Sequence, residues 1–142
     1  AEPLQAALES GDPTRIVATA TPYIGRGTGL TPTGDDLVTG AFGAYRLIGE
    51  ARGVSDNGAV LDRVAAGLNE TLTVTTSFSA SVVRHALAGR VAAPVAQTLR
   101  ALVGRAPLDD AFEALLRVGH TSGRALAQGV LIGAGAACGG SS

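Results

Sequence analysis

Two segments of this chain carry small residues at helical spacing, and this feature restricts the fold more than any other. The apolar side chains of residues 35–50 recur at the period of a buried amphipathic helix. The second stripe of this segment is small and consists of Asp36, Gly40 and Gly43. The last apolar segment has a similar stripe, made of Gly129, Gly133 and Ala137. Because small residues let helices approach closely, we predict a helical bundle with these two helices at its centre.

The rest of the chain shows helical periodicity in further segments. They are residues 3–9, 13–23, 60–69, 77–88, 91–103 and 108–118. Asp12 is expected to cap the second of them, and Gly89 to end the fourth. Residues 71–81 could include a short strand, but the sequence offers no partner strand, so we predict a loop in which Thr76 or Ser77 caps the next helix. We therefore predict an all-α fold, a single-domain bundle of about six to eight helices with a glycine-rich loop before a central helix.

The composition restricts the class of protein. The chain has 142 residues, which fits one domain, so we assign residues 1–142 to a single α-helical domain. Hydrophobic residues make up 46% of the chain but aromatic residues only 4%, so the core must consist mainly of Ala, Leu and Val. The net charge of -1 provides no general field that would attract nucleic acid or an anionic membrane. The sequence shows no signal peptide and no apolar run long enough to cross a bilayer, so we expect a cytoplasmic protein.

The sequence predicts no metal site and no cofactor. Cys138 is the single cysteine and cannot form an internal disulfide. Two histidines and one cysteine also lack the spacing of a zinc site.

Residues 25–36 form a glycine-rich loop directly before the central helix. The loop contains four glycines, three threonines, one proline and two adjacent aspartates. The simplest interpretation is a helix entrance in which Thr33 or Asp35 caps the helix and both carboxylates face the positive end of its dipole. The length of the glycine run additionally favours a binding role. A P-loop is excluded, because Asp35 and Asp36 stand where lysine and a hydroxyl residue should be and no strand precedes the loop.

Two further polar places lie at predicted helix ends or loops. They are Arg84 with His85, and His120, Thr121 and Ser122 with Arg124. Guanidinium groups and helix N-termini bind carboxylate or phosphate, so these places and the loop would form an anion pocket if they met at one end of the bundle. Simpler alternatives exist. In these alternatives His85, which shares a helix face with Phe78 and Val82, is a core histidine. The hydroxyls are helix caps, and the arginines are partners of carboxylates.

Three motifs, in order along the chain, resemble those of a known bacterial family. They are Gly-Thr-Gly-Leu-Thr-Pro-Thr-Gly-Asp-Asp at residues 27–36, Thr-Thr at 75–76 with Val-Arg-His-Ala at 83–86, and Val-Gly-His-Thr-Ser-Gly at 118–123. The family includes the AllH-type subunit of oxamate carbamoyltransferase, and this chain resembles the helical C-terminal half of its longer members. The resemblance implies a role in allantoin breakdown. In that reaction oxalurate and phosphate give oxamate and carbamoyl phosphate, with two further subunits and no redox cofactor.

The candidate site residues are taken from the positions of these motifs. For catalysis they are Asp35, Asp36, His85 and His120. For substrate binding they are Gly27, Gly29, Thr31, Thr33, Gly34, Arg84, Thr121, Ser122 and Arg124. In this hypothesis the loop amides and the arginines hold phosphate or carboxylate, an aspartate accepts hydrogen bonds from the carbamoyl NH₂, and a histidine transfers a proton.

The resemblance also implies the partners. They are a small anionic substrate, namely a carbamoyl or phosphate compound, and other carbamoyltransferase subunits, with no nucleic acid and no membrane. Two alternatives are a non-catalytic ligand-binding or assembly subunit and a purely structural helical domain. Activity that depends on partner subunits distinguishes the enzyme from the binding subunit, and absence of anion binding favours the structural domain.

Overall fold

The computed structural model describes residues 3–27, 30–53, 56–104, 108–117 and 122–139. Within these ranges it contains eight α-helices, two short 3₁₀ helices and no strand. In chain order they are α1 (Leu4–Ser10), α2 (Pro13–Ala20), η1 (Thr21–Tyr23), α3 (Thr33–Ala51), α4 (Asp56–Leu68), η2 (Thr71–Val74), α5 (Ser77–Leu87), α6 (Ala93–Leu102), α7 (Leu108–Leu116) and α8 (Ser122–Gly139). The all-α prediction is confirmed, and the predicted helices agree closely with these bounds.

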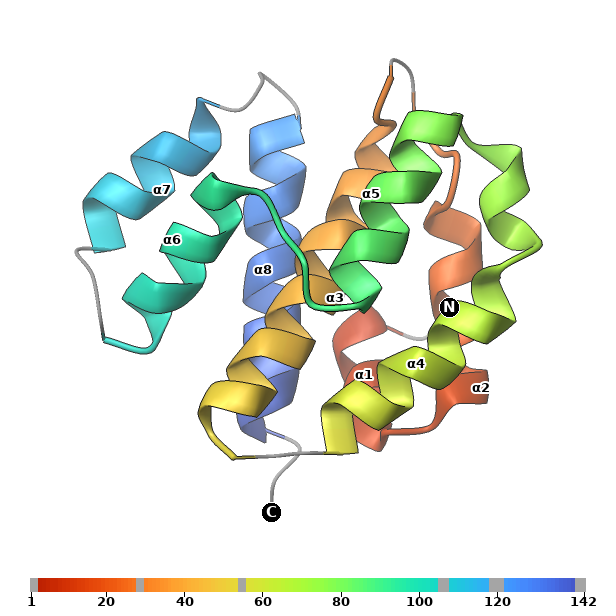
Figure 1. Ribbon diagram of the computed structural model, residues 1–142, viewed down its shortest axis with the longest axis horizontal. Helices are drawn as coiled ribbons and strands as arrows, with labels where there is room; N and C mark the ends of the chain where they lie inside the picture. Colours follow the sequence, from red (N-terminus) through yellow and green to blue (C-terminus); the bar gives the residue numbers. More distant parts are fainter. Residues whose placement is uncertain (1–2, 28–29, 54–55, 105–107, 118–121, 140–142) are drawn as a thin grey trace.

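Helices α3 and α8 lie side by side through the middle of the molecule (Figure 1). Helices α1, α2, α4 and α5 pack on one side of this pair, and α6 and α7 on the other. The start of α3 meets the start of α8, and later turns of α3 meet later turns of α8, so the two helices run parallel. Their N-termini therefore lie at the same end of the bundle.

Backbone contacts between α3 and α8 explain the small-residue stripes. A β-carbon on Gly40 would lie 2.4 Å from the carbonyl oxygen of Leu126, and one on Gly129 would lie 2.1 Å from that of Leu37. No side chain fits at such distances, so glycine is required for this approach. The prediction that these two helices are central is confirmed.

The buried core surrounds this pair and consists mainly of aliphatic side chains. The largest fully buried residues are Phe42, Leu8, Ile16, Leu61, Leu68, Leu72, Leu87 and Leu115, together with several valines. Phe42 projects from α3, while the leucines and Ile16 come from the surrounding helices and η2. In the described part of the chain, no helix combines the length and hydropathy needed to cross a membrane.

Side-chain caps start two of the helices where the sequence predicts them. Asp12 Oδ1 accepts a hydrogen bond of 3.0 Å from the backbone N–H of Thr14 at the start of α2. Thr76 Oγ1 accepts one of 3.0 Å from the backbone N–H of Ser79 at the start of α5. Residues 71–81 contain no strand, as predicted, but they are not a simple loop, because they include η2 and the first turns of α5.

The start of α3 differs from the prediction. Thr33 is its first residue, Pro32 precedes it, and no side chain caps the first turn. The expectation that Thr33 or Asp35 caps this helix is therefore wrong. Asp35 and Asp36 do lie in the first turn, where the helix dipole favours negative charge.

Gly133→Ala is expected to destabilise the bundle, because its β-carbon would lie 2.1 Å from the carbonyl oxygen of Ala41. The helices must separate to admit this methyl group, and such overpacking costs about 1–3 kcal/mol. Gly135→Ala on the same helix is the matched control, since its β-carbon meets the flexible end of Gln5 at 2.9 Å. Alanine favours a helix over glycine by about 1 kcal/mol, so the control should be neutral or stabilising. Urea unfolding measures both variants, and equal effects would contradict the close contact.

Candidate functional site

The carboxylate of Asp35 fastens the glycine-rich loop to α5. Asp35 is only 1% exposed. Its Oδ1 accepts a hydrogen bond of 2.7 Å from the backbone N–H of Gly25. Its Oδ2 accepts hydrogen bonds from the hydroxyls of Ser79, at 2.6 Å, and Thr75. Because its partners lie in the loop and at the start of α5, Asp35 connects both segments to the start of α3.

A second contact holds the loop on the same neighbour. Thr76 Oγ1 donates a hydrogen bond of 2.6 Å to the carbonyl oxygen of Leu30, in addition to capping α5. The two threonines of the middle motif therefore both bind the glycine-rich loop, Thr75 through Asp35 and Thr76 through Leu30. This explains physically why the first two motifs lie together.

The glycines of the loop that the structure describes are required by the path of the backbone. Gly25 and Gly27 have φ angles of 79° and 116°, which favour glycine. A β-carbon on Gly34 would lie 1.9 Å from the carbonyl oxygen of Tyr23, so glycine is required there too. The N–H of Gly34 donates to the carbonyl oxygen of Arg26 at 2.9 Å, and that of Gly25 is bound to Asp35, so neither amide is available to a ligand.

A cavity of about 520 Å³ next to the loop lies between α3, α5, α8 and the start of α6. Its polar lining residues are Thr31, Asp36, Thr39, His85, Arg90 and Ser122. Its apolar walls are formed by Phe78, Val82, Val91, Ala92, Val95 and Leu126. The volume falls in the range of small-molecule sites, and a few polar groups in an apolar wall are typical of them.

Asp36 supplies the most unusual group of this cavity. The residue is 5% exposed, and its buried Oδ2 has no hydrogen-bond partner within the described residues. Burial raises the pKa of Asp36 from its ordinary 3.8 to about 6, and the charge of Asp35 adds to the shift, while the hydroxyls of Ser122 and Thr31 oppose it. Those two hydroxyl oxygens lie 3.3 Å from each other, where the N-termini of α3 and α8 meet.

His85 and Arg90 form a pair on the exposed side of the cavity. Arg90 Nε donates a hydrogen bond of 3.0 Å to His85 Nδ1, and both residues line the cavity. His85 is exposed, so the alternative that it is a core histidine is wrong. Because Nδ1 accepts this hydrogen bond, the neutral ring carries its proton on Nε2.

The remaining candidates lie elsewhere. Arg84 is exposed and donates to Asn69 Oδ1 at 3.5 Å, and neither Arg84 nor the exposed Arg124 lines the cavity. Gly27, Thr33 and Gly34 border a different cavity of about 280 Å³. Gly29, His120 and Thr121 lie outside the described residues.

Two polar residues of the cavity, Arg90 and Thr39, are not among the candidates from the sequence. Arg90 directly follows Gly89, which ends α5 with a φ of 86° and turns the chain so that Arg90 returns beside His85. Thr39 lies three residues after Asp36 on α3, and therefore on the same helix face. The helix-ending glycine and the helical spacing were the signals that could have found them.

Comparison with known proteins identifies the family. The family model described as oxamate carbamoyltransferase subunit AllH matches residues 23–134. The chain belongs to this family. The matched segment includes every residue that lines the 520 Å³ cavity of this AllH-family chain. No solved structure matches the chain.

Asp35→Asn is expected to destabilise the protein by about 3 kcal/mol, because buried hydrogen bonds to a charged acceptor contribute about 1.5–3 kcal/mol each and the amide cannot accept all of them. Asp62→Asn is the matched control, since the Asp62 side chain is 69% exposed. Denaturant unfolding at neutral pH compares the two variants. A loss below about 0.5 kcal/mol for Asp35→Asn would contradict its role in fastening the loop.

The raised pKa of Asp36 predicts a pH-dependent stability. A buried acid with a folded-state pKa near 6 binds its proton more tightly when folded, so its favourable contribution is complete below pH 3.8 and is lost as the pH rises through about 6. Relative to Asp36→Asn, the wild type should therefore lose about 2–3 kcal/mol between about pH 4 and pH 7. Unfolding free energies measured across this range test the effect. A constant difference between the two proteins would show that Asp36 has an ordinary pKa.

Proposed function

We propose that this domain forms the substrate-binding part of an oxamate carbamoyltransferase and that the 520 Å³ cavity holds the carbamoyl donor, oxalurate. The observation that carries the proposal is Asp36, a buried carboxylate that lines the cavity and whose Oδ2 has no hydrogen-bond partner in the described structure. Burying such an acceptor costs about 1–3 kcal/mol unless a donor reaches it. The NH₂ group of a carbamoyl compound supplies that donor.

The arrangement of polar groups favours one orientation of the donor. Asp36 is buried and therefore lies at the closed side of the cavity, whereas Arg90 is exposed and lies at its open side. The carbamoyl group would bind Asp36, with the hydroxyls of Thr31 and Ser122 near its carbonyl oxygen. A guanidinium binds carboxylate or phosphate as a fork, so Arg90 would hold the carboxylate of oxalurate or the incoming phosphate.

The proposed chemistry is transfer of the carbamoyl group to phosphate. An oxygen of hydrogen phosphate forms a bond to the carbamoyl carbon, and the bond from that carbon to the oxamate nitrogen breaks. The phosphate loses its proton and the oxamate nitrogen takes up one, so the step balances. With a pKa near 6, Asp36 is mainly ionised at neutral pH and accepts hydrogen bonds from the carbamoyl NH₂. His85 carries its proton on Nε2 beside the cavity and would donate a hydrogen bond to the leaving nitrogen while negative charge develops on it. His120 keeps the same proposed role as an alternative.

This proposal changes the roles of some candidates. Asp35 becomes a positioning residue, because its oxygens are bound to Gly25, Thr75 and Ser79. Arg90 takes the anion-binding role that the sequence assigned to Arg84. The described loop glycines become structural, whereas Thr31 and Ser122 remain candidate substrate-binding residues.

Asp36→Asn and Arg90→Ala are each expected to lower kcat/KM for oxalurate about 10- to 100-fold, because each removes a charge-assisted hydrogen bond worth about 1.5–3 kcal/mol. The assay uses the full-length chain assembled with its partner subunits. Arg124→Ala is the matched control, since Arg124 is exposed and does not line the cavity, and it should change kcat/KM less than about twofold.

Calorimetry on the same complex separates the remaining hypotheses. Oxalurate, oxamate and carbamoyl phosphate should bind the wild type, and Asp36→Asn should weaken that binding. Weaker binding with an unchanged kcat would indicate a ligand-binding subunit without chemistry of its own. No effect of either variant on binding and turnover would place the substrate elsewhere and leave a structural domain, and binding of a nucleoside triphosphate alone would refute the carbamoyl assignment.

A further inference from the structure

The turn that follows α5 carries both residues on the exposed side of the cavity. His85 lies in the last turn of α5, and Arg90 lies just after Gly89, which ends the helix. The backbone N–H of Arg90 donates a hydrogen bond of 2.8 Å to the carbonyl oxygen of His85, which closes the turn. The position of the whole turn therefore determines where the two side chains meet the cavity.

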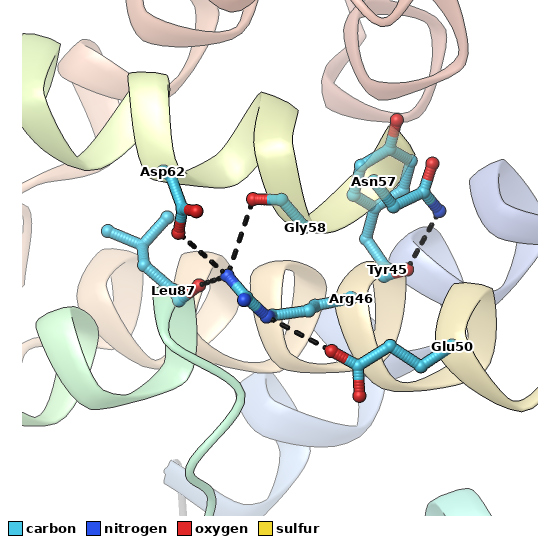
Figure 2. A network of polar contacts seen from close by, with 7 residues as sticks. All are labelled: Tyr45, Arg46, Glu50, Asn57, Gly58, Asp62 and Leu87. Atoms are coloured by element: carbon cyan, nitrogen blue, oxygen red, sulfur yellow. Dashed lines mark hydrogen bonds and ion pairs between the residues drawn. The ribbon is translucent and has the colours of Figure 1, made fainter. Parts of the chain in front are cut away.

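The guanidinium of Arg46 on α3 binds this turn through a backbone carbonyl. Arg46 Nη1 donates hydrogen bonds of 2.9 Å to the carbonyl oxygen of Leu87, 3.0 Å to Asp62 and 3.4 Å to the carbonyl oxygen of Gly58 (Figure 2). Its Nε donates one of 3.3 Å to Glu50. The Arg46 side chain is only 19% exposed, so it joins α3, α4 and the end of α5 in a partly buried network.

Close packing reinforces this contact on both sides of the turn. A β-carbon on Gly89 would lie 3.2 Å from Cδ of Arg46, so the turn rests directly on the aliphatic part of that side chain. One turn earlier on α3, a β-carbon on Gly43 would lie 2.7 Å from Cγ1 of Val91. Residues 87–91 therefore pack on α3 through one hydrogen bond and two close contacts.

We propose that Arg46 is a positioning residue of the carbamoyl-binding site, which holds the His85–Arg90 pair at a fixed distance from Asp36. This inference rests on the proposed function of the cavity. Asp36 and Arg46 lie on the same helix, about 15 Å apart along its axis, so α3 acts as a rigid spacer between them. The hydrogen bond from Arg46 to the carbonyl oxygen of Leu87 fixes the turn after α5 at this distance from Asp36.

The chemistry of the network requires arginine rather than a generic cation. The partners Glu50 and Asp62 have side chains that are largely exposed, and such surface ion pairs contribute little to stability. The planar guanidinium reaches the carbonyl oxygens of Leu87 and Gly58 while it also contacts the carboxylates. Lysine keeps the charge but loses this fork geometry.

The first test compares Arg46→Lys with Arg52→Lys in the full-length chain assembled with its partner subunits. Arg52 also lies at α3, and its Nη1 donates a hydrogen bond of 2.9 Å to the carbonyl oxygen of Ala137, away from the cavity. Arg46→Lys should increase amide hydrogen exchange in residues 85–91 about tenfold and raise KM for oxalurate about three- to tenfold, with a smaller change in kcat. Arg52→Lys should leave both measurements unchanged.

A second pair of variants tests the contact between Arg46 and the turn by changing the turn itself. Gly89→Ala and Gly104→Ala both place alanine at a helix-ending glycine, with φ of 86° and 81°. The new β-carbon would meet the Arg46 side chain at Gly89, whereas at Gly104 it would meet no described atom within 4 Å. Both should lose stability through backbone strain. Only Gly89→Ala should also raise KM for oxalurate.

The outcomes separate this inference from the function on which it rests. Unchanged exchange in residues 85–91 for Arg46→Lys, or equal effects of Arg46→Lys and Arg52→Lys, would refute the positioning role. Increased exchange with unchanged KM and kcat would show that Arg46 holds the turn but that His85 and Arg90 do not act on the substrate, which would refute the assignment of that pair. Increased exchange with a raised KM supports both.

Discussion

The backbone contact between α3 and α8 is the constraint on which the rest of the structure depends. Gly40 and Gly129 let the two helices touch, and because the helices run parallel, the chain must cross the whole bundle between them. The helices of that crossing, from α4 to α7, include α5 and α6, which contribute to the walls of the cavity. The two N-termini meet at Thr31 and Ser122, where their dipoles jointly favour negative charge. One packing contact therefore both stabilises the core and brings two helix N-termini to the edge of the cavity.

Two adjacent carboxylates have opposite physical roles at that site. Successive helix residues point about 100° apart, so Asp35 faces α5 while Asp36 faces the cavity. Asp35 accepts hydrogen bonds from Gly25, Thr75 and Ser79. In contrast, Oδ2 of Asp36 is buried without a hydrogen-bond partner in the described structure. A buried carboxylate oxygen without a hydrogen-bond partner lowers stability, and proteins commonly keep such groups where a ligand binds them.

The sequence predicted the parts of the fold that depend on local pattern and small residues. Helical periodicity and the Asp12 and Thr76 caps agree with the structure because each depends on residues close in the chain. The small-residue stripes agree because glycines at helical spacing allow a second helix to approach closely wherever it lies in the chain. The start of α3 was mispredicted, since the carboxylate of Asp35 is bound by residues far along the chain. Arg90 was missed for a similar reason, because its approach to His85 depends on how a turn is seated against another helix.

The glycine-rich loop illustrates how the same residues can support two interpretations. Its composition suits a loop whose amides bind phosphate, yet the amides of Gly25 and Gly34 are bound within the protein, and the contact at Gly34 explains why a side chain is not tolerated there. Polar side chains and the N-termini of α3 and α8 remain around the apolar cavity. In such a cavity the effective dielectric is low, so the burial that raises the pKa of Asp36 would also strengthen a hydrogen bond from a carbamoyl NH₂. The unfavourable burial of this carboxylate and its suitability for the proposed ligand thus have one physical cause.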